Sequence, residues 1–366
     1  MLARLHRQET RLSCKNAQNN CIISPVLVSD FNYNLPEEVI AQHPPKVRGT
    51  TRLLVLNRKT GEYTDSRYAD LADFLQPGDL IVLNDTRVMR SRVFTERKSD
   101  GHPRELVVLE RHNGEVDHVM YRGKLHEGEE LVVKNVATGE LTTDIITIKE
   151  ILGNGTATAT AARPLELIAQ EYGNVPLPPY MHREAKKEDI ERYQTIWAKD
   201  LGSAAAPTAS LNMTKELLKK LEEKGVTIKY LTLHVGLGTF LPIRTDNVEE
   251  HKMHSEWFQI PEDTIEAIKA TKAAGHHVIA VGTTVTRTLE FWAKTGKTEG
   301  EDNIFIYPGF EFKAIDALVT NFHAPKSTVL MLTAAFAGWD HLKPAYEHAI
   351  ESGYKLLSYG DSMFIY

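Results

Sequence analysis

The hydrophobic pattern changes period in the middle of residues 277–291, HVIAVGTTVTRTLEF. Residues 278–281 form a short, continuous apolar run, which is typical of a strand covered on both faces in an α/β sheet. Gly282 permits a sharp turn, and the pattern after it is that of a helix. This stretch therefore predicts a buried strand, a tight turn and a helix.

Strand and helix patterns alternate through the second half of the chain. Strands are predicted over 226–235, 278–281, 317–321 and 356–359, and helices over 214–225, over 262–274, from Ser327 and near Pro344. Such alternation implies an α/β fold with a largely parallel sheet and helices on both faces.

The hydrophobic pattern and the spacing of turn residues change over residues 91–162. Short β-rich segments there are separated by turns containing Gly or Asn, which indicates a small all-β, barrel-like domain inserted into the main one. The predicted organisation is a flexible N-terminal extension (1–27), a discontinuous main α/β catalytic domain (28–90 and 163–366) and the inserted domain (91–162).

Composition places the chain among ordinary globular proteins. It has 366 residues, 42% of them hydrophobic and 25% charged, with a net charge of −6 that makes no global case for binding nucleic acid. Its two cysteines, Cys14 and Cys21, offer neither a disulfide framework nor a CxxC metal site. With no membrane span or signal peptide in the sequence, we expect a cytoplasmic protein.

Polar residues follow the predicted strands of the sheet. Ligands bind beyond the carboxyl ends of strands in open α/β sheets, so these residues are expected to form a site. They are His234, Gly236 and Gly238 after the first strand, Gly282, Thr283 and Thr284 after the second, Asn321 and His323 after the third, and Tyr359 and Asp361 after the fourth.

The turn at Gly282 is a candidate anion site. The first-turn amides of a helix carry partial positive charge, and Thr283, Thr284 and Arg287 can add hydroxyl and guanidinium donors. A capped helix with a surface arginine is the alternative. The spacing of Gly236 and Gly238 does not continue as a dinucleotide fingerprint, and His251, His254 and Glu256 lack a third spaced ligand, so neither an NAD site nor a metal site is expected.

From about residue 28 to the end, the chain resembles the S-adenosylmethionine:tRNA ribosyltransferase-isomerase family of queuosine biosynthesis. The resemblance rests on DFNYNLP, NDTRV, PLPPY, RYQT, AAPTA, TLHVGLGTF, HKMHSE, VGTT with Arg287, IYPGF, LVTNFHAPKST and SYGD. It implies that the ribosyl part of S-adenosylmethionine is transferred and isomerised onto 7-aminomethyl-7-deazaguanine in the tRNA anticodon loop. The product is epoxyqueuosine, adenine and methionine are released, and S-adenosylmethionine is a consumed co-substrate.

This chemistry needs a base beside the sulfonium and an acid for the departing adenine. His234 and His323 are the candidates for proton transfer, and Glu256 or Asp361 for orienting them or pairing with the sulfonium. The expected substrate-binding residues are Gly236, Gly238, Thr239, Phe240, Gly282, Thr283, Thr284, Arg287, Asn321 and Tyr359. Tyr180, Phe240 and Tyr307 are further candidates for stacking on a base.

The chain departs from the family's pattern at AAPTAGLHF, which here reads AAPTASLNM, and at Arg90, Ser91, Val285 and Thr286. Asn212 therefore stands where the family has a histidine. We expect it to position the substrate, while the alternative is a cap for the next helix. Two other readings stay open, namely a diverged homologue that binds tRNA or a nucleoside without this reaction, and a general α/β enzyme acting on a small carboxylate or phosphate.

Overall fold

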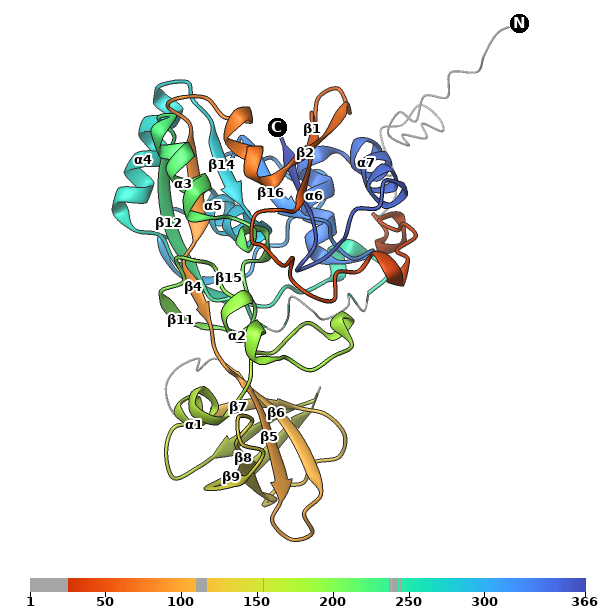
Figure 1. The fold of residues 1–366 in the computed structure, drawn as a ribbon, viewed down its shortest axis with the longest axis vertical. Helices are drawn as coiled ribbons and strands as arrows, with labels where there is room; N and C mark the ends of the chain where they lie inside the picture. Colours follow the sequence, from red (N-terminus) through yellow and green to blue (C-terminus); the bar gives the residue numbers. More distant parts are fainter. Residues whose placement is uncertain (1–25, 110–116, 154, 237, 239–242, 244) are drawn as a thin grey trace, which may run out of the picture.

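The computed structural model describes residues 26–109, 117–153, 155–236, 238, 243 and 245–366. It consists of a main body built on a nine-stranded sheet and a smaller closed β-barrel, which lie one above the other in Figure 1. The predicted N-terminal extension falls outside the described residues except for Val26 and Leu27. No helix in the described part of the chain has the length and apolar character needed to cross a membrane.

The sheet of the main body is mixed, which corrects the expectation of a largely parallel sheet. Four of its neighbouring pairs are parallel and four are antiparallel. The prediction failed because hydrophobic runs do not encode strand direction. Two of the antiparallel pairs join consecutive strands with no α-helix between them, and a third joins the last two strands of the chain, which two α-helices separate. The strand order is β15 (Glu299–Asp302), β13 (Glu256–Gln259), β12 (Thr227–Leu233), β3 (Leu80–Asn84), β14 (Val278–Val281), β16 (Ala317–Asn321), β17 (Ser362–Ile365), β1 (Arg52–Leu56) and β2 (Tyr63–Arg67).

Both faces of this sheet are buried, because successive side chains of each strand point to opposite sides. Leu80 and Val82 of β3 belong to one apolar cluster, and Ile81 and Leu83 to the other. The first cluster is completed by α4 (Glu262–Ala273), α5 (Thr283–Thr295), α6 (Thr328–Ala337) and α7 (Trp339–Glu351), and the second by the 3-10 helix η3 (Tyr68–Phe74) and α3 (Lys215–Glu223).

The helices begin in two different ways. Thr214 caps α3, as predicted, and its Oγ1 accepts the N–H of Leu217 at 3.1 Å. Ser327 caps α6 in the same way through the N–H of Leu330. By contrast, α5 begins at Gly282, whose φ of 98° suits glycine, and has no side-chain cap. Within the described ranges, the first amides of α5 therefore have no side-chain partner.

The β-rich segment forms a closed, six-stranded antiparallel barrel, as expected. Its core includes Val93, Leu131 and Ile146, and also Leu165 and Ile168 of the following helix, so it extends past the predicted boundary at residue 162. We propose that the barrel and this helix form the inserted unit. In order around the barrel the strands are β10 (Thr156–Thr160), β7 (Asp117–Tyr121), β6 (Pro103–Val108), β5 (Arg92–Arg97), β8 (Glu130–Lys134) and β9 (Leu141–Gly153), and the helix is α1 (Leu165–Tyr172).

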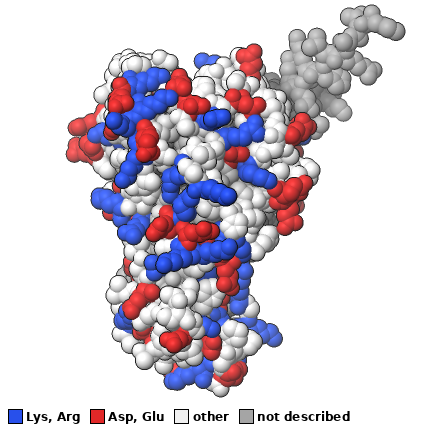
Figure 2. Space-filling model, viewed as in Figure 1, with Lys and Arg blue, Asp and Glu red and all other residues white. Residues whose placement is uncertain are grey.

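The remaining elements lie at the junction of the two parts or line the main body. Two short strands, β4 (Thr86–Val88) and β11 (Asp200–Ser203), pair in parallel just above the barrel in Figure 1. Basic and acidic side chains are interspersed over the face of both parts shown in Figure 2. The other elements are α2 (Lys187–Arg192) and the 3-10 helices η1 (Val28–Asp30), η2 (Glu37–Val39), η4 (Pro179–Met181), η5 (Thr208–Ser210) and η7 (Val248–Glu250).

Residues 356–359, predicted as the last strand, form a turn instead. Leu357 has a φ of 69°, in the left-handed region that interrupts a strand. The last strand is β17, which begins at Ser362, opposite Asn321 of β16. Asp361 consequently precedes the strand rather than following it. It still lies at the carboxyl edge of β16, because β17 runs antiparallel to that strand.

Candidate active site

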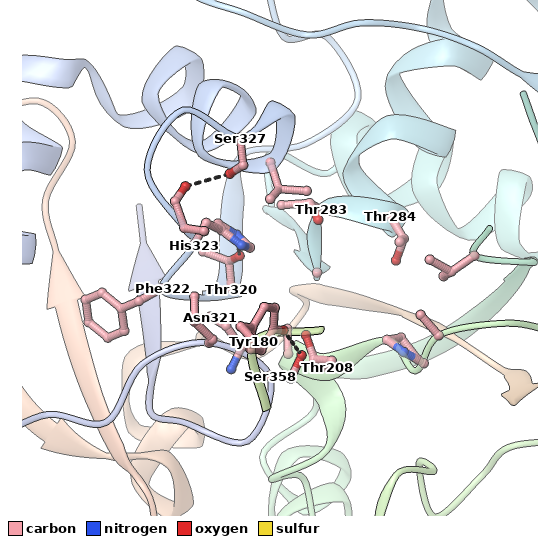
Figure 3. A pocket seen from close by; sticks show the side chains of 18 of the residues that line it. Tyr180, Thr208, Thr283, Thr284, Thr320, Asn321, Phe322, His323, Ser327 and Ser358 are labelled. Carbon is pink, nitrogen blue, oxygen red and sulfur yellow. Dashed lines mark hydrogen bonds between the residues drawn. The ribbon is translucent and has the colours of Figure 1, made fainter. Parts of the chain in front are cut away.

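A cavity of about 510 Å³ opens at the carboxyl edge of β14 and β16. Its walls come from several segments that are distant in the sequence, together with the first turn of α5 (Figure 3). These segments include residues 179–180, 205–209, 320–327 and 357–358. Most of the wall is apolar, with a small number of polar groups at fixed places, which is the usual composition of a small-molecule site. The polar side chains among the lining residues are those of Tyr180, Thr208, Thr283, Thr284, Thr320, Asn321, His323, Lys326, Ser327 and Ser358.

The first turn of α5 forms one side of this cavity. Gly282, Thr283 and Thr284 all line it, and the first intrahelical bond of α5 is donated only by the N–H of Thr286. The Thr284 hydroxyl is buried and has no hydrogen-bond partner among the described residues. Ala209 of the AAPTA segment packs against this turn, since a Cβ on Gly282 would lie 3.7 Å from that of Ala209. The turn thus places at the cavity wall a hydroxyl and backbone N–H groups that have no partner among the described residues.

The end of β16 forms the neighbouring wall. The N–H of Gly282 donates to the Val319 carbonyl at 2.7 Å, which fixes the two strand ends side by side. Asn321 is 2% exposed. Its Nδ2 donates to the Asp361 carbonyl at 3.3 Å, while its Oδ1 is buried without a partner among the described residues. Because only the NH₂ group can donate to a carbonyl, this bond fixes the orientation of the amide.

His323 lies in the same wall and is held from several directions. Its Nε2 lies 2.8 Å from the Thr320 hydroxyl. Its backbone N–H donates to the Tyr346 hydroxyl, and its carbonyl accepts from the Tyr33 hydroxyl at 2.6 Å. Burial lowers the pKa of His323 to about 3, because a charged imidazolium would lose its hydration there. The ring is therefore neutral at pH 7.

Tyr180 closes the cavity from the proline-rich segment. Its hydroxyl lies 2.5 Å from the Ser358 hydroxyl, in the loop before β17 (Figure 3). Burial raises the pKa of Tyr180 to about 12, so this phenol is protonated at neutral pH. The cavity therefore contains one neutral imidazole and one protonated phenol.

Three residues expected at the site lie behind the cavity wall. The Asp361 carboxylate accepts the backbone N–H groups of Arg52 (2.7 Å) and Lys355 (2.8 Å). Tyr359 points away and donates to Asp189 at 2.7 Å. His234 is buried, with its Nδ1 2.8 Å from the Thr86 hydroxyl and its ring stacked on Trp257. None of the three is among the described residues that line the cavity.

Arg287 and Glu256 form a buried ion pair outside the cavity. Arg287 Nη1 lies 2.7 Å from Glu256 Oε2, and its Nη2 lies 3.7 Å from Asp302 Oδ2. Glu256 Oε1 accepts the N–H of Gly236 at 2.9 Å, so the pair is tied to the loop after β12. Gly238 follows in that loop, and a Cβ there would clash with the ring of His254. Thr239 and Phe240 lie outside the described residues.

Asn212 does not cap α3, a role that belongs to Thr214. It is buried, and its Nδ2 donates to the Gly360 carbonyl at 3.1 Å. Gly360 has no room for a side chain, because a Cβ would lie 2.3 Å from the Lys355 carbonyl. Asn212 therefore joins the AAPTAS segment to the loop before β17 from behind the cavity.

Several lining residues were not singled out from the sequence. Thr320, Lys326 and Ser327 lie within or next to the LVTNFHAPKST motif, so the motif itself was a usable signal for them. Ser358 is the first residue of the SYGD motif, in which only Tyr359 and Asp361 were expected at the site. Among the described residues, no group of three or more His, Cys, Asp or Glu side chains is placed to hold a metal ion.

Comparison with known proteins gives a consistent result over almost the whole chain. Residues 28–365 match the family model described as queuosine biosynthesis protein. Proteins named S-adenosylmethionine:tRNA ribosyltransferase-isomerase are 54% identical in Pelodictyon phaeoclathratiforme and 44% identical in Francisella tularensis subsp. novicida. Each alignment covers 92% of this chain and at least 98% of the relative. The crystal structure of S-adenosylmethionine tRNA ribosyltransferase from Thermotoga maritima is 32% identical, with a TM-score of 0.52, covering 92% of this chain and all of that one.

The buried pair predicts the effect of removing Arg287. In the Arg287→Ala variant, Glu256 and Asp302 stay buried without their counter-charge, so the free energy of unfolding should fall by about 3 to 5 kcal/mol. Urea unfolding measures this change. Arg67→Ala, at an exposed position in β2, is the control and should change it by less than about 0.5 kcal/mol. Unchanged stability with weakened ligand affinity would instead make Arg287 a ligand-binding group.

Proposed function

Since this chain belongs to the queuosine biosynthesis protein family, we propose that it is an S-adenosylmethionine:tRNA ribosyltransferase-isomerase. It transfers and isomerises the ribosyl group of S-adenosylmethionine onto 7-aminomethyl-7-deazaguanine in tRNA. The products are epoxyqueuosine in tRNA, adenine and methionine. The observation that carries the proposal is the family match over residues 28–365. All the described residues that line the cavity lie within that range.

The cavity suits S-adenosylmethionine as the consumed co-substrate. Its volume of about 510 Å³ is within the range of sites for ligands of this size. Its apolar walls suit the adenosine part, and the ring of Tyr180 is placed in the wall, where an aromatic face can attract a sulfonium cation. Lys326 lies exposed at the edge of the lining, where it can meet a phosphate of the tRNA.

His323 and Tyr180 are the proton carriers that we propose. A neutral imidazole can accept a proton from the ribose carbon beside the sulfonium, and a protonated phenol can donate one to the departing adenine. At neutral pH the imidazole is deprotonated and can accept a proton, and the phenol is protonated and can donate one. His234 was the other candidate base, but its ring faces Thr86 and Trp257 rather than the cavity.

The alternative is a diverged homologue that binds tRNA or a nucleoside without reaction. It was suggested by the altered AAPTAS segment, and above all by Asn212. Asn212 bonds to the Gly360 carbonyl behind the cavity wall. Asn212 is not among the described lining residues, so its difference from the family's histidine lies outside the cavity wall.

Adenine release tests the proposed reaction. Wild-type protein should release adenine only when both S-adenosylmethionine and tRNA carrying 7-aminomethyl-7-deazaguanine are present. His323→Gln should lower the rate by about 100-fold to 10,000-fold, because glutamine cannot accept a proton. Chromatographic quantification of adenine gives both results.

His234→Gln is the matched control, because it changes a buried histidine that does not line the cavity. The rate of adenine release should fall less than about 10-fold. Such a loss is smaller than the loss of about 100-fold or more that is expected when a catalytic acid or base is removed. A larger loss in His234→Gln than in His323→Gln would overturn the assignment of the base. The absence of adenine release from wild-type protein with both substrates would overturn the proposed function.

The lowered pKa of His323 predicts a dependence of stability on pH. The unfolded state takes up a proton at this residue near pH 6.5, whereas the folded state does so only near pH 3. Stability should therefore fall as the pH is lowered through 6.5, and this part of the loss should be missing in His323→Gln. Urea unfolding at pH 7 and pH 5 measures it. A ring resonance of His323 that titrates near pH 6.5 in the folded protein would contradict the prediction.

A further inference from the structure

Two buried polar atoms in the cavity have no hydrogen-bond partner among the described residues. One is the Thr284 hydroxyl, which can donate, and the other is Asn321 Oδ1, which can only accept. An unpaired buried polar group costs free energy, so such atoms in a cavity wall are most simply explained by a ligand that pairs with them. The two atoms differ in what they require of that ligand.

The donor side of the cavity suits an anion. The N–H groups of Thr283, Thr284 and Val285 precede the first intrahelical bond of α5, and no side chain in the described part of the chain caps them. These three amides have no hydrogen-bond partner among the described residues and lie at the positive end of a thirteen-residue helix. With the Thr284 hydroxyl beside them, they form a place for a carboxylate or phosphate. The helix end therefore specifies negative charge.

The acceptor side suits a cation. Asn321 Nδ2 is held by the Asp361 carbonyl, so its Oδ1 cannot exchange places with the NH₂ group. An acceptor oxygen would repel a phosphate but accepts a hydrogen bond from an ammonium group. Asn321 also lies beside the start of α5, because the Gly282 N–H is bonded to Val319, two residues before it. The ligand must therefore present an anion and a hydrogen-bond donor close together.

We infer that the cavity binds the α-amino-acid end of S-adenosylmethionine between α5 and β16. The carboxylate lies on the first-turn amides of α5 and the Thr284 hydroxyl, and the ammonium group donates to Asn321 Oδ1. This inference rests on the proposed function, because it takes S-adenosylmethionine as the ligand. It also separates the anion site from Arg287, whose charge is matched by Glu256 and Asp302. Lys326 is the one Lys or Arg among the described lining residues, as suits a zwitterion rather than a phosphate dianion.

The affinities of three ligands, measured by isothermal titration calorimetry, distinguish the carboxylate contact from the ammonium contact. S-adenosylmethionine carries both groups, its decarboxylated form keeps only the ammonium group, and 5′-methylthioadenosine has neither. Thr284→Val should weaken S-adenosylmethionine about 10-fold and leave the decarboxylated form unchanged, because one bond to a charged group is lost. Asn321→Ala should weaken both of these ligands about 10-fold and leave 5′-methylthioadenosine unchanged.

Thr288→Val is the matched control on the same helix. Its hydroxyl donates to the Thr284 carbonyl and is buried, and it does not line the cavity, so all three affinities should stay unchanged. Equal losses for all three ligands in Thr284→Val would show a general disturbance of the cavity and overturn the inference. Weaker tRNA binding with unchanged S-adenosylmethionine affinity would place a nucleic-acid phosphate at α5 and also overturn it.

Failure of this inference and failure of the proposed function give different experimental results. Suppose that wild-type protein releases adenine but binds S-adenosylmethionine and its decarboxylated form equally well. This result would refute the inference and would leave the proposed function unaffected. Wild-type protein that releases no adenine would refute the function. These two failures come from different measurements on the same protein.

Discussion

The buried carboxylate of Asp361 is the interaction on which the site depends most. It accepts the N–H of Arg52 at the start of β1 and that of Lys355 at the start of the loop before β17. A carboxylate that accepts backbone donors fixes their position strongly, since such bonds to a charged group are about twice as strong as neutral ones. The loop before β17 is thereby held against the sheet.

Three features of the cavity follow from this one attachment. The loop carries Leu357 and Ser358, which line the cavity, and Ser358 contacts Tyr180. The Asp361 carbonyl orients the amide of Asn321, and the Gly360 carbonyl accepts from Asn212. Asp361, expected to be a catalytic residue, is not among the described lining residues, and its bonds hold the wall in place.

The sequence predicted those parts of the structure that depend on local pattern. The strand at 278–281, the turn at Gly282 and the helix after it are encoded by neighbouring residues, as is the cap at Thr214. The position of Asn321 and His323 also follows locally, because both come at or just after the end of a buried strand.

The parts that the sequence did not predict depend on distant partners. Arg287 has the composition of an anion-binding residue, and only the fold shows that Glu256, 31 positions away, neutralises it. Tyr359 and Ser358 are neighbours, but the turn sends one toward Asp189 and the other toward the cavity. The direction of β17 was likewise hidden, since an apolar run reads the same in either direction.

Amide hydrogen exchange with and without S-adenosylmethionine tests most directly whether the cavity is the co-substrate site. We expect slower exchange on binding at residues 283–285 and 321–327, with exchange in the barrel strands unchanged. These are the first turn of α5 and the loop after β16, whose amides face or adjoin the cavity. Protection confined to residues outside the cavity walls, with none at 283–285, would contradict the account.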